Sequence, residues 1–91
     1  MKVINTKIEN AIIFEPNLFE DERGFFLESW NEEIFKKYFN EKTRFVQDNH
    51  SFSKKNVIRG LHYQINKPQG KLLRVTKGSI LDIIVDLRYN S

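Results

Sequence analysis

Hydrophobic and polar positions alternate most clearly near the end of the chain. Four aliphatic residues there face a second set that is mostly charged: Leu81, Ile83, Val85 and Leu87 against Asp82, Ile84, Asp86 and Arg88. Successive side chains of a strand point to opposite faces, so this alternation predicts a strand over residues 80–87. Short segments rich in β-branched and aromatic residues predict further strands over residues 11–14, 25–30, 43–49, 57–64 and 71–76. The pattern as a whole predicts an all-β domain.

Residues typical of turns and of helix ends interrupt this pattern. The sequence Asp-Glu-Arg-Gly at 21–24 predicts a turn, because Gly24 tolerates backbone angles that other residues resist. Asn31 is a typical helix N-cap, and two glutamates follow it in the first turn. Four apolar residues then recur at helical spacing: Ile34, Phe35, Tyr38 and Phe39. These signals predict one short helix over residues 32–40.

The length of the chain limits the core that it can form. A chain of 91 residues forms one small domain and buries only about 60–65% of its unfolded surface. The pattern also stops directly after the predicted strand at 80–87, which leaves an uncovered edge. We therefore expect residues 1–91 to be the N-terminal part of a single domain whose C-terminal half is absent.

Composition narrows the class of protein. The 15 basic and 12 acidic residues give a net charge of +3, and this mild excess does not indicate nucleic acid as a partner. Cysteine is absent, which excludes disulfides and thiolate metal sites. No segment is apolar and long enough for a signal peptide or a membrane span. We expect a cytoplasmic protein with neither a membrane nor a nucleic acid as its partner.

The strongest chemical signal is the string Arg-Gly-Leu-His-Tyr-Gln at 59–64, followed by Lys71. Histidine titrates near neutral pH and is the usual general base, while a nearby cation stabilises the negative charge that base catalysis creates. His62 and Lys71 are therefore the candidate catalytic pair. Without further context, a structural histidine and a solvated lysine would be the more ordinary interpretation.

Three strings together carry a family resemblance: FEDERGFFLESW, FVQDNHSFSKKNVIRGLHYQ and KLLRVTKGSILDIIVDLR. They closely resemble the N-terminal half of the dTDP-4-dehydrorhamnose 3,5-epimerases, cupin-fold enzymes of dTDP-L-rhamnose biosynthesis. The resemblance implies an antiparallel jelly roll, here incomplete, and an isomerase that needs no cofactor. It also implies a homodimer that acts on a dTDP-linked 4-keto-6-deoxy sugar, dTDP-4-keto-6-deoxyglucose.

The resemblance also implies a role for each candidate residue. His62 would remove protons beside the 4-keto group, and Lys71 would stabilise the enolate. The substrate-binding residues would be Arg23, Phe26, Glu28, Gln47, Asp48, Asn49 and Arg59. Arg59 would hold the diphosphate, the segment 47–49 would hold the nucleotide, with Asp48 contributing only its main chain, and the first three would reach the nucleotide from the neighbouring subunit. The general acid and the carboxylate that orients the histidine belong to the other half, so we expect the isolated chain to epimerise little.

The alternation of side chains between the two faces of a strand sets a condition for a shared pocket. Gln47 and Asn49 are two residues apart and share a face, whereas Arg59 and His62 are three apart and would face opposite sides of a regular strand. A shared pocket therefore requires an irregularity, and Gly60 is the natural place for it. A regular ladder over residues 57–64 would contradict the shared pocket.

Other functions stay open at this point. The chain has no His-x-His motif, because Gln64 replaces the second histidine, and residues 65–70 hold no carboxylate; a metal site is not expected. A mono-epimerase acting on a related dTDP-keto sugar is one alternative. A non-catalytic half-cupin that binds a sugar nucleotide or assists assembly is another. Binding of dTDP separates a binding module from an inert remnant.

Overall fold

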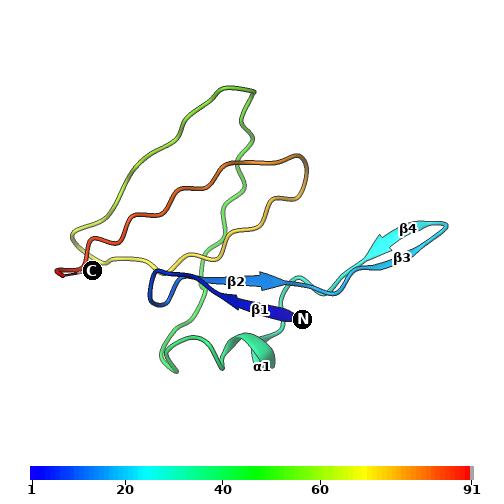
Figure 1. The fold of residues 1–91 in the computed structure, drawn as a ribbon, viewed down its shortest axis with the longest axis horizontal. Helices are drawn as coiled ribbons and strands as arrows, with labels where there is room; N and C mark the ends of the chain where they lie inside the picture. The colour runs from blue at the N-terminus through cyan, green and yellow to red at the C-terminus, as the bar shows by residue number, and fades with distance from the viewer. Residues whose placement is uncertain (91) are drawn as a thin grey trace.

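Two antiparallel hairpins and one short helix are the regular elements of the computed structural model, which describes residues 1–90 (Figure 1). The hairpins are formed by β1 (Lys2–Asn5) with β2 (Ile12–Glu15) and by β3 (Phe19–Asp21) with β4 (Gly24–Phe26). The helix α1 covers Glu32–Phe35. All regular sheet is antiparallel and helix is scarce, in agreement with the predicted class and with part of a cupin-like fold.

The first hairpin pairs Val3 with Phe14 and Ile4 with Ile13. Burial alternates along β2: Phe14 is half-buried, whereas Ile13 is 52% exposed. The sequence pattern predicted the second strand within one residue of its observed start but missed β1. Its signal was the β-branched pair Val3–Ile4, which is short but of the composition typical of strands.

The second hairpin confirms the predicted turn at 21–24. Asp21 pairs with Gly24, which adopts φ +133°, and the two residues between them form the loop. Asp21 Oδ1 accepts a 2.8 Å hydrogen bond from the backbone N–H of Arg23, so the aspartate closes the turn with its own side chain. The strand predicted at 25–30 starts one residue early and ends at Phe26, and β3 was not predicted.

The helix begins where the sequence predicted. Asn31 is extended and its Oδ1 accepts a 3.2 Å hydrogen bond from the N–H of Ile34, which satisfies one of the free donors of the first turn. The helix ends earlier than predicted, at Phe35. Beyond it, Lys37 and Tyr38 donate to the carbonyls of Ile34 and Phe35, three residues back, so the chain continues as tight turns.

The Asn31 cap provides a stability prediction. Replacing Asn31 with alanine should lower the free energy of unfolding by about 1 kcal/mol, because the N–H of Ile34 loses its acceptor. Asn31→Ser should retain most of the stability, since its hydroxyl oxygen can accept the same hydrogen bond. Urea titration followed by circular dichroism measures both. Equal stability of the alanine and asparagine forms would contradict the capping role.

One aromatic cluster, formed by Phe14, Trp30, Phe35, Tyr38, Phe39 and Phe45, is the packed centre of the described chain. Phe35 lies in its middle, with ring centroids 4.4 Å from Phe14 and 4.8 Å from Trp30. It is 1% exposed and is the only hydrophobic side chain buried within residues 1–90. The cluster joins β2 to α1 and to the segment that follows it, and it is the main source of apolar burial.

Four predicted strands are absent from the described structure: 43–49, 57–64, 71–76 and 80–87. Figure 1 shows this part of the chain, from green to red, as wide loops without paired strands. The predictions were wrong for this chain because a strand forms only when a neighbour accepts its hydrogen bonds and covers its apolar face. Neither is supplied here: Val46 is 88% exposed, Ile58 90% and Leu81 87%.

Candidate active site

Gln47 and Asn49 are the sequence-predicted site residues that the structure joins directly. Gln47 Nε2 donates a 3.2 Å hydrogen bond to Asn49 Oδ1, so the two amides lie together as their parity predicted. The remaining donors and acceptors of this amide pair face solvent, because both residues are exposed. Asp48 between them is exposed as well. This arrangement offers a polar edge of the kind that can hydrogen-bond a nucleobase or a ribose.

The Arg59 guanidinium folds back onto the preceding loop. Arg59 Nε donates to Ser53 Oγ at 2.8 Å, and Nη2 donates to the carbonyl of Phe52 at 3.0 Å. These two neutral acceptors orient the planar fork and leave its charge without a carboxylate partner among residues 1–90. An oriented guanidinium of this kind suits a diphosphate, which it can bind through two parallel hydrogen bonds. Sequence analysis missed Ser53, since nothing in the local pattern links it to Arg59.

Gly60 is irregular, as the parity argument predicted. Its φ of +116° lies in the region that L side chains rarely adopt, and no regular ladder covers 57–64 in the described structure. A Cβ built on Gly60 would lie 3.7 Å from the backbone nitrogen of His62 and 3.9 Å from its Nδ1. The backbone at Gly60 is therefore irregular, and residues 1–90 contain no regular ladder that would contradict a shared pocket for Arg59 and His62.

His62 and Lys71 are both exposed. Within residues 1–90 neither side chain takes part in a hydrogen bond or an ion pair. An imidazole without a hydrogen-bonded carboxylate lacks the partner that fixes its tautomer in a working base. The described chain presents the two reactive groups but not the groups that would orient them.

Three further candidates lie on or after the second hairpin. Arg23 forms an ion pair with Asp21, with Nη2 and Oδ2 separated by 2.6 Å, and this hydrogen-bonded guanidinium lowers the pKa of the Asp21 carboxyl. Phe26 is 70% exposed and its ring lies 6.5 Å from that of Phe19. Glu28 Oε1 accepts a 3.0 Å hydrogen bond from Asn31 Nδ2. Arg23 and Phe26 belong to the β3–β4 hairpin, which projects away from the rest of the chain (Figure 1).

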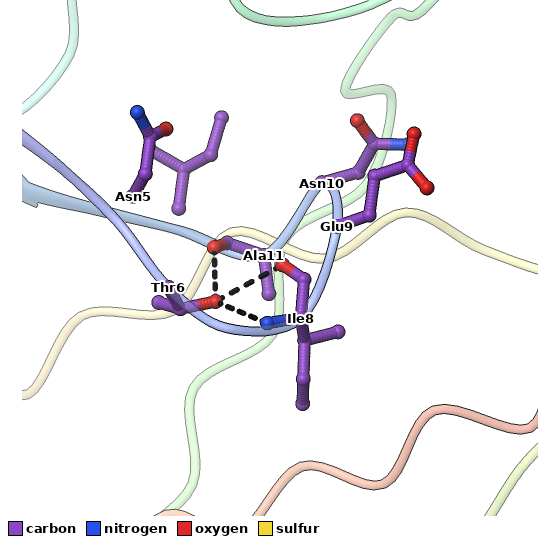
Figure 2. Close-up of a pocket in the computed structure, with 7 residues that line it drawn as sticks. Asn5, Thr6, Ile8, Glu9, Asn10 and Ala11 are labelled. Carbon is purple, nitrogen blue, oxygen red and sulfur yellow. Dashed lines mark hydrogen bonds between the residues drawn. The ribbon is translucent and has the colours of Figure 1, made fainter. Parts of the chain in front are cut away.

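The two described cavities lie away from all of these candidates. One, of about 300 Å³, lies at the turn between β1 and β2, where the Thr6 hydroxyl approaches the Ala11 carbonyl at 2.7 Å and accepts from the N–H of Ile8 at 3.2 Å (Figure 2). The other lies between this turn and residues 86–90. Neither of these two cavities is lined by a candidate site residue.

The sequence as a whole decides the family. A model of the family described as dTDP-4-dehydrorhamnose 3,5-epimerase matches residues 5–91. The chain belongs to the dTDP-4-dehydrorhamnose 3,5-epimerase family. The resemblance inferred from the three strings is thereby confirmed.

Individual relatives agree with this assignment. The chain is 52% identical over 92 residues to a dTDP-4-dehydrorhamnose 3,5-epimerase of Shigella flexneri, an alignment that covers 100% of this chain and 51% of the relative. A relative of the same name from Methanothermobacter thermautotrophicus is 54% identical over 90 residues, and the alignment covers 99% of this chain and 48% of the relative. A third, from Pseudomonas aeruginosa, is 50% identical over 91 residues, and the alignment covers 100% of this chain and 50% of the relative. The chain spans about half the length of these curated relatives.

No group of three or more histidine or carboxylate side chains is gathered within residues 1–90 in a way that could hold a metal ion. In the same residues, no helix has both the length and the apolar character needed to cross a membrane.

Proposed function

We propose that this chain carries the base and oxyanion side of a site that epimerises carbons 3 and 5 of dTDP-4-keto-6-deoxyglucose. The observation that carries the proposal is the family match over residues 5–91, since every candidate residue lies inside the matched stretch. Relatives about half identical to the chain bear the epimerase name. The product would enter dTDP-L-rhamnose biosynthesis.

His62 is the proposed base. A proton beside a ketone is weakly acidic, so its removal requires a base within hydrogen-bonding distance and a cation where negative charge grows on the keto oxygen. The His62 imidazole takes the proton, and the electron pair of the C–H bond moves into an enolate whose oxygen is stabilised by the Lys71 ammonium. Return of a proton to the opposite face of the carbon inverts its configuration. The reaction is redox-neutral and requires no cofactor.

The same surface would hold the substrate. Arg59 is already oriented by two neutral acceptors, so its charge is available to a diphosphate. The joined amides of Gln47 and Asn49 offer donors and acceptors for the nucleotide, and Asp48 would contribute its main chain. These contacts would set the keto sugar at a fixed distance from the diphosphate and thus beside His62 and Lys71.

A second subunit would complete the nucleotide site. The projecting β3–β4 hairpin supports this idea, because its aromatic residues have little to pack against in the described chain: Phe25 and Phe26 are each 70% exposed (Figure 1). In a homodimer, the hairpin of one protomer and the residues directly after it would bring Arg23, Phe26 and Glu28 to the nucleotide of its partner. The Arg23–Asp21 ion pair would keep the tip of this arm in one conformation.

We also propose that the jelly roll is completed by residues equivalent to the second half of the relatives. Large apolar side chains of the loops 43–88 are exposed in the described structure, and burying them requires a second layer. The general acid and the carboxylate that orients His62 would come from that layer. The chain by itself should then be nearly inactive.

A chimera tests the proposal. Residues 1–91 would be continued by the second half of the Pseudomonas aeruginosa relative, and deuterium at carbons 3 and 5 of dTDP-4-keto-6-deoxyglucose would be measured by NMR in D₂O. We expect incorporation at both carbons with the chimera and almost none with the 91-residue chain. Rapid exchange by the short chain would refute the need for a second half. A folded chimera that binds dTDP without exchange would favour a binding module, and exchange at one carbon a mono-epimerase.

A further inference from the structure

Arg88 connects two parts of the chain that are far apart in sequence. Its Nη2 donates a 2.8 Å hydrogen bond to the carbonyl of Glu9, at the turn between β1 and β2. Figure 1 shows the red end of the chain beside this turn. The contact therefore links the end of the 80–87 segment to the first hairpin across 79 residues of sequence.

Asp86 holds the Arg88 guanidinium in place for this contact. Arg88 Nε lies 2.9 Å from Asp86 Oδ1, Nη2 lies 2.8 Å from Oδ2, and the backbone N–H of Arg88 donates to Oδ1 at 3.0 Å. The Asp86 side chain is only 17% exposed, in contrast to the loops around it. A two-point pair of this type fixes the plane of the guanidinium, so the second hydrogen of Nη2 points at the Glu9 carbonyl.

The acceptor at the turn is the main chain of Glu9. The Glu9 carboxylate is 3.8 Å from Arg88 Nη1 and 82% exposed, a geometry in which an ion pair contributes little. The attachment therefore depends on the shape of the guanidinium fork more than on the charge of Glu9. Lysine has one ammonium group and cannot engage both Asp86 oxygens and the carbonyl in this way.

We propose that Asp86, Arg88 and the Glu9 carbonyl form a clasp that holds the 80–87 segment against the β1–β2 turn. The clasp is a positional device rather than part of the chemistry. It keeps the predicted last strand of this chain near the first hairpin although no strand pairing does so in residues 1–90. A neighbouring strand or layer can then add to a segment whose position is already restricted.

The pH range of the clasp follows from Asp86. Hydrogen bonds from Arg88 lower the pKa of the Asp86 carboxyl from 3.8 to about 2. The other charged groups at this cavity, Lys7 and Glu9, are exposed. Because the pKa of Asp86 is lowered in the folded state, the clasp makes its full contribution to the stability of the fold above pH 3.8. That contribution is lost as the pH falls through about 2.

Distance measurement by pulsed electron paramagnetic resonance tests the clasp. The chain contains no cysteine, so K7C and Y89C introduce a unique pair of nitroxide labels on the two sides of the cavity. We expect a narrow, short distance distribution for the labelled chain between pH 4 and 7, and loss of the short component in R88K and R88Q. E9Q is the matched control and should retain the short component, because the carbonyl remains.

The outcomes separate the clasp from a general charge effect. A short distance that survives in R88K would show that positive charge alone suffices, and it would overturn the proposal. So would a broad distribution in the parent chain, or a loss in E9Q as large as that in R88K. These results are independent of epimerase activity, so they do not depend on the proposed function.

Discussion

The chimera carrying His62→Asn should incorporate deuterium into the keto sugar about 10²–10⁴-fold more slowly than the parent chimera, the usual contribution of a general base. Asparagine has a similar size and still forms hydrogen bonds, but it cannot accept the proton at neutral pH. His62 is exposed in the described structure, so the same substitution in the 91-residue chain should leave its stability unchanged. The rate of exchange at carbons 3 and 5, followed by NMR, is the measurement.

The other histidine of the chain, His50, provides the control. His50 is exposed as well and has no role in the proposed chemistry, so His50→Asn should exchange at the parental rate. Lys71→Met should lower the rate by about 10²–10³-fold, because the developing oxyanion loses its cation. If His62→Asn and His50→Asn had equal rates, another group would be the base, and the assignment of His62 would be abandoned.

Replacing Phe35 with alanine should remove about 3–5 kcal/mol from the free energy of unfolding, the cost of emptying a packed aromatic site. The ring is 1% exposed and contacts Phe14 and Trp30 at centroid distances of 4.4 Å and 4.8 Å. No other hydrophobic side chain within residues 1–90 is buried, so the described fold has little else to compensate for its loss. We expect the 91-residue variant to be largely unfolded.

Trp30 is the single tryptophan of the chain and stacks on Phe35, so its fluorescence reports directly on the cluster during urea titration. Phe52→Ala is the matched control. That ring is 80% exposed, and its removal should change the stability by less than about 0.5 kcal/mol. Equal effects of the two substitutions would mean that the aromatic cluster does not stabilise the chain.

Structural features that depend on a few neighbouring residues were predicted correctly from the sequence. The cap at Asn31, the turn closed by Gly24 and the irregularity at Gly60 were all predicted, because each depends on one residue and its immediate neighbours. The hydrogen bond between Gln47 and Asn49 agrees with strand parity for the same reason, since an extended backbone places alternate side chains on one side whether or not it is paired.

Contacts between segments that are distant in the sequence were not predicted. The four predicted strands between 43 and 87 are unpaired in residues 1–90, since alternating apolar residues state only which face a strand would bury. Ser53 as the partner of Arg59 and Glu9 as the partner of Arg88 left no signal in the pattern, because both contacts depend on how loops return in space. The hydrophobic pattern indicates which apolar face a segment would bury, but it does not indicate which other segment packs against that face.

The sequence by itself determined the family of this chain and the local chemistry of its turns and cap, and it proposed the residues of the candidate site. Those properties depend on residue identity and on short-range sterics. Only the tertiary structure decided that Phe35 is the buried centre, that the second hairpin projects, and that Arg88 reaches the first turn. These depend on contacts between distant segments, whose formation balances the entropy of ordering the chain against the burial that each contact achieves.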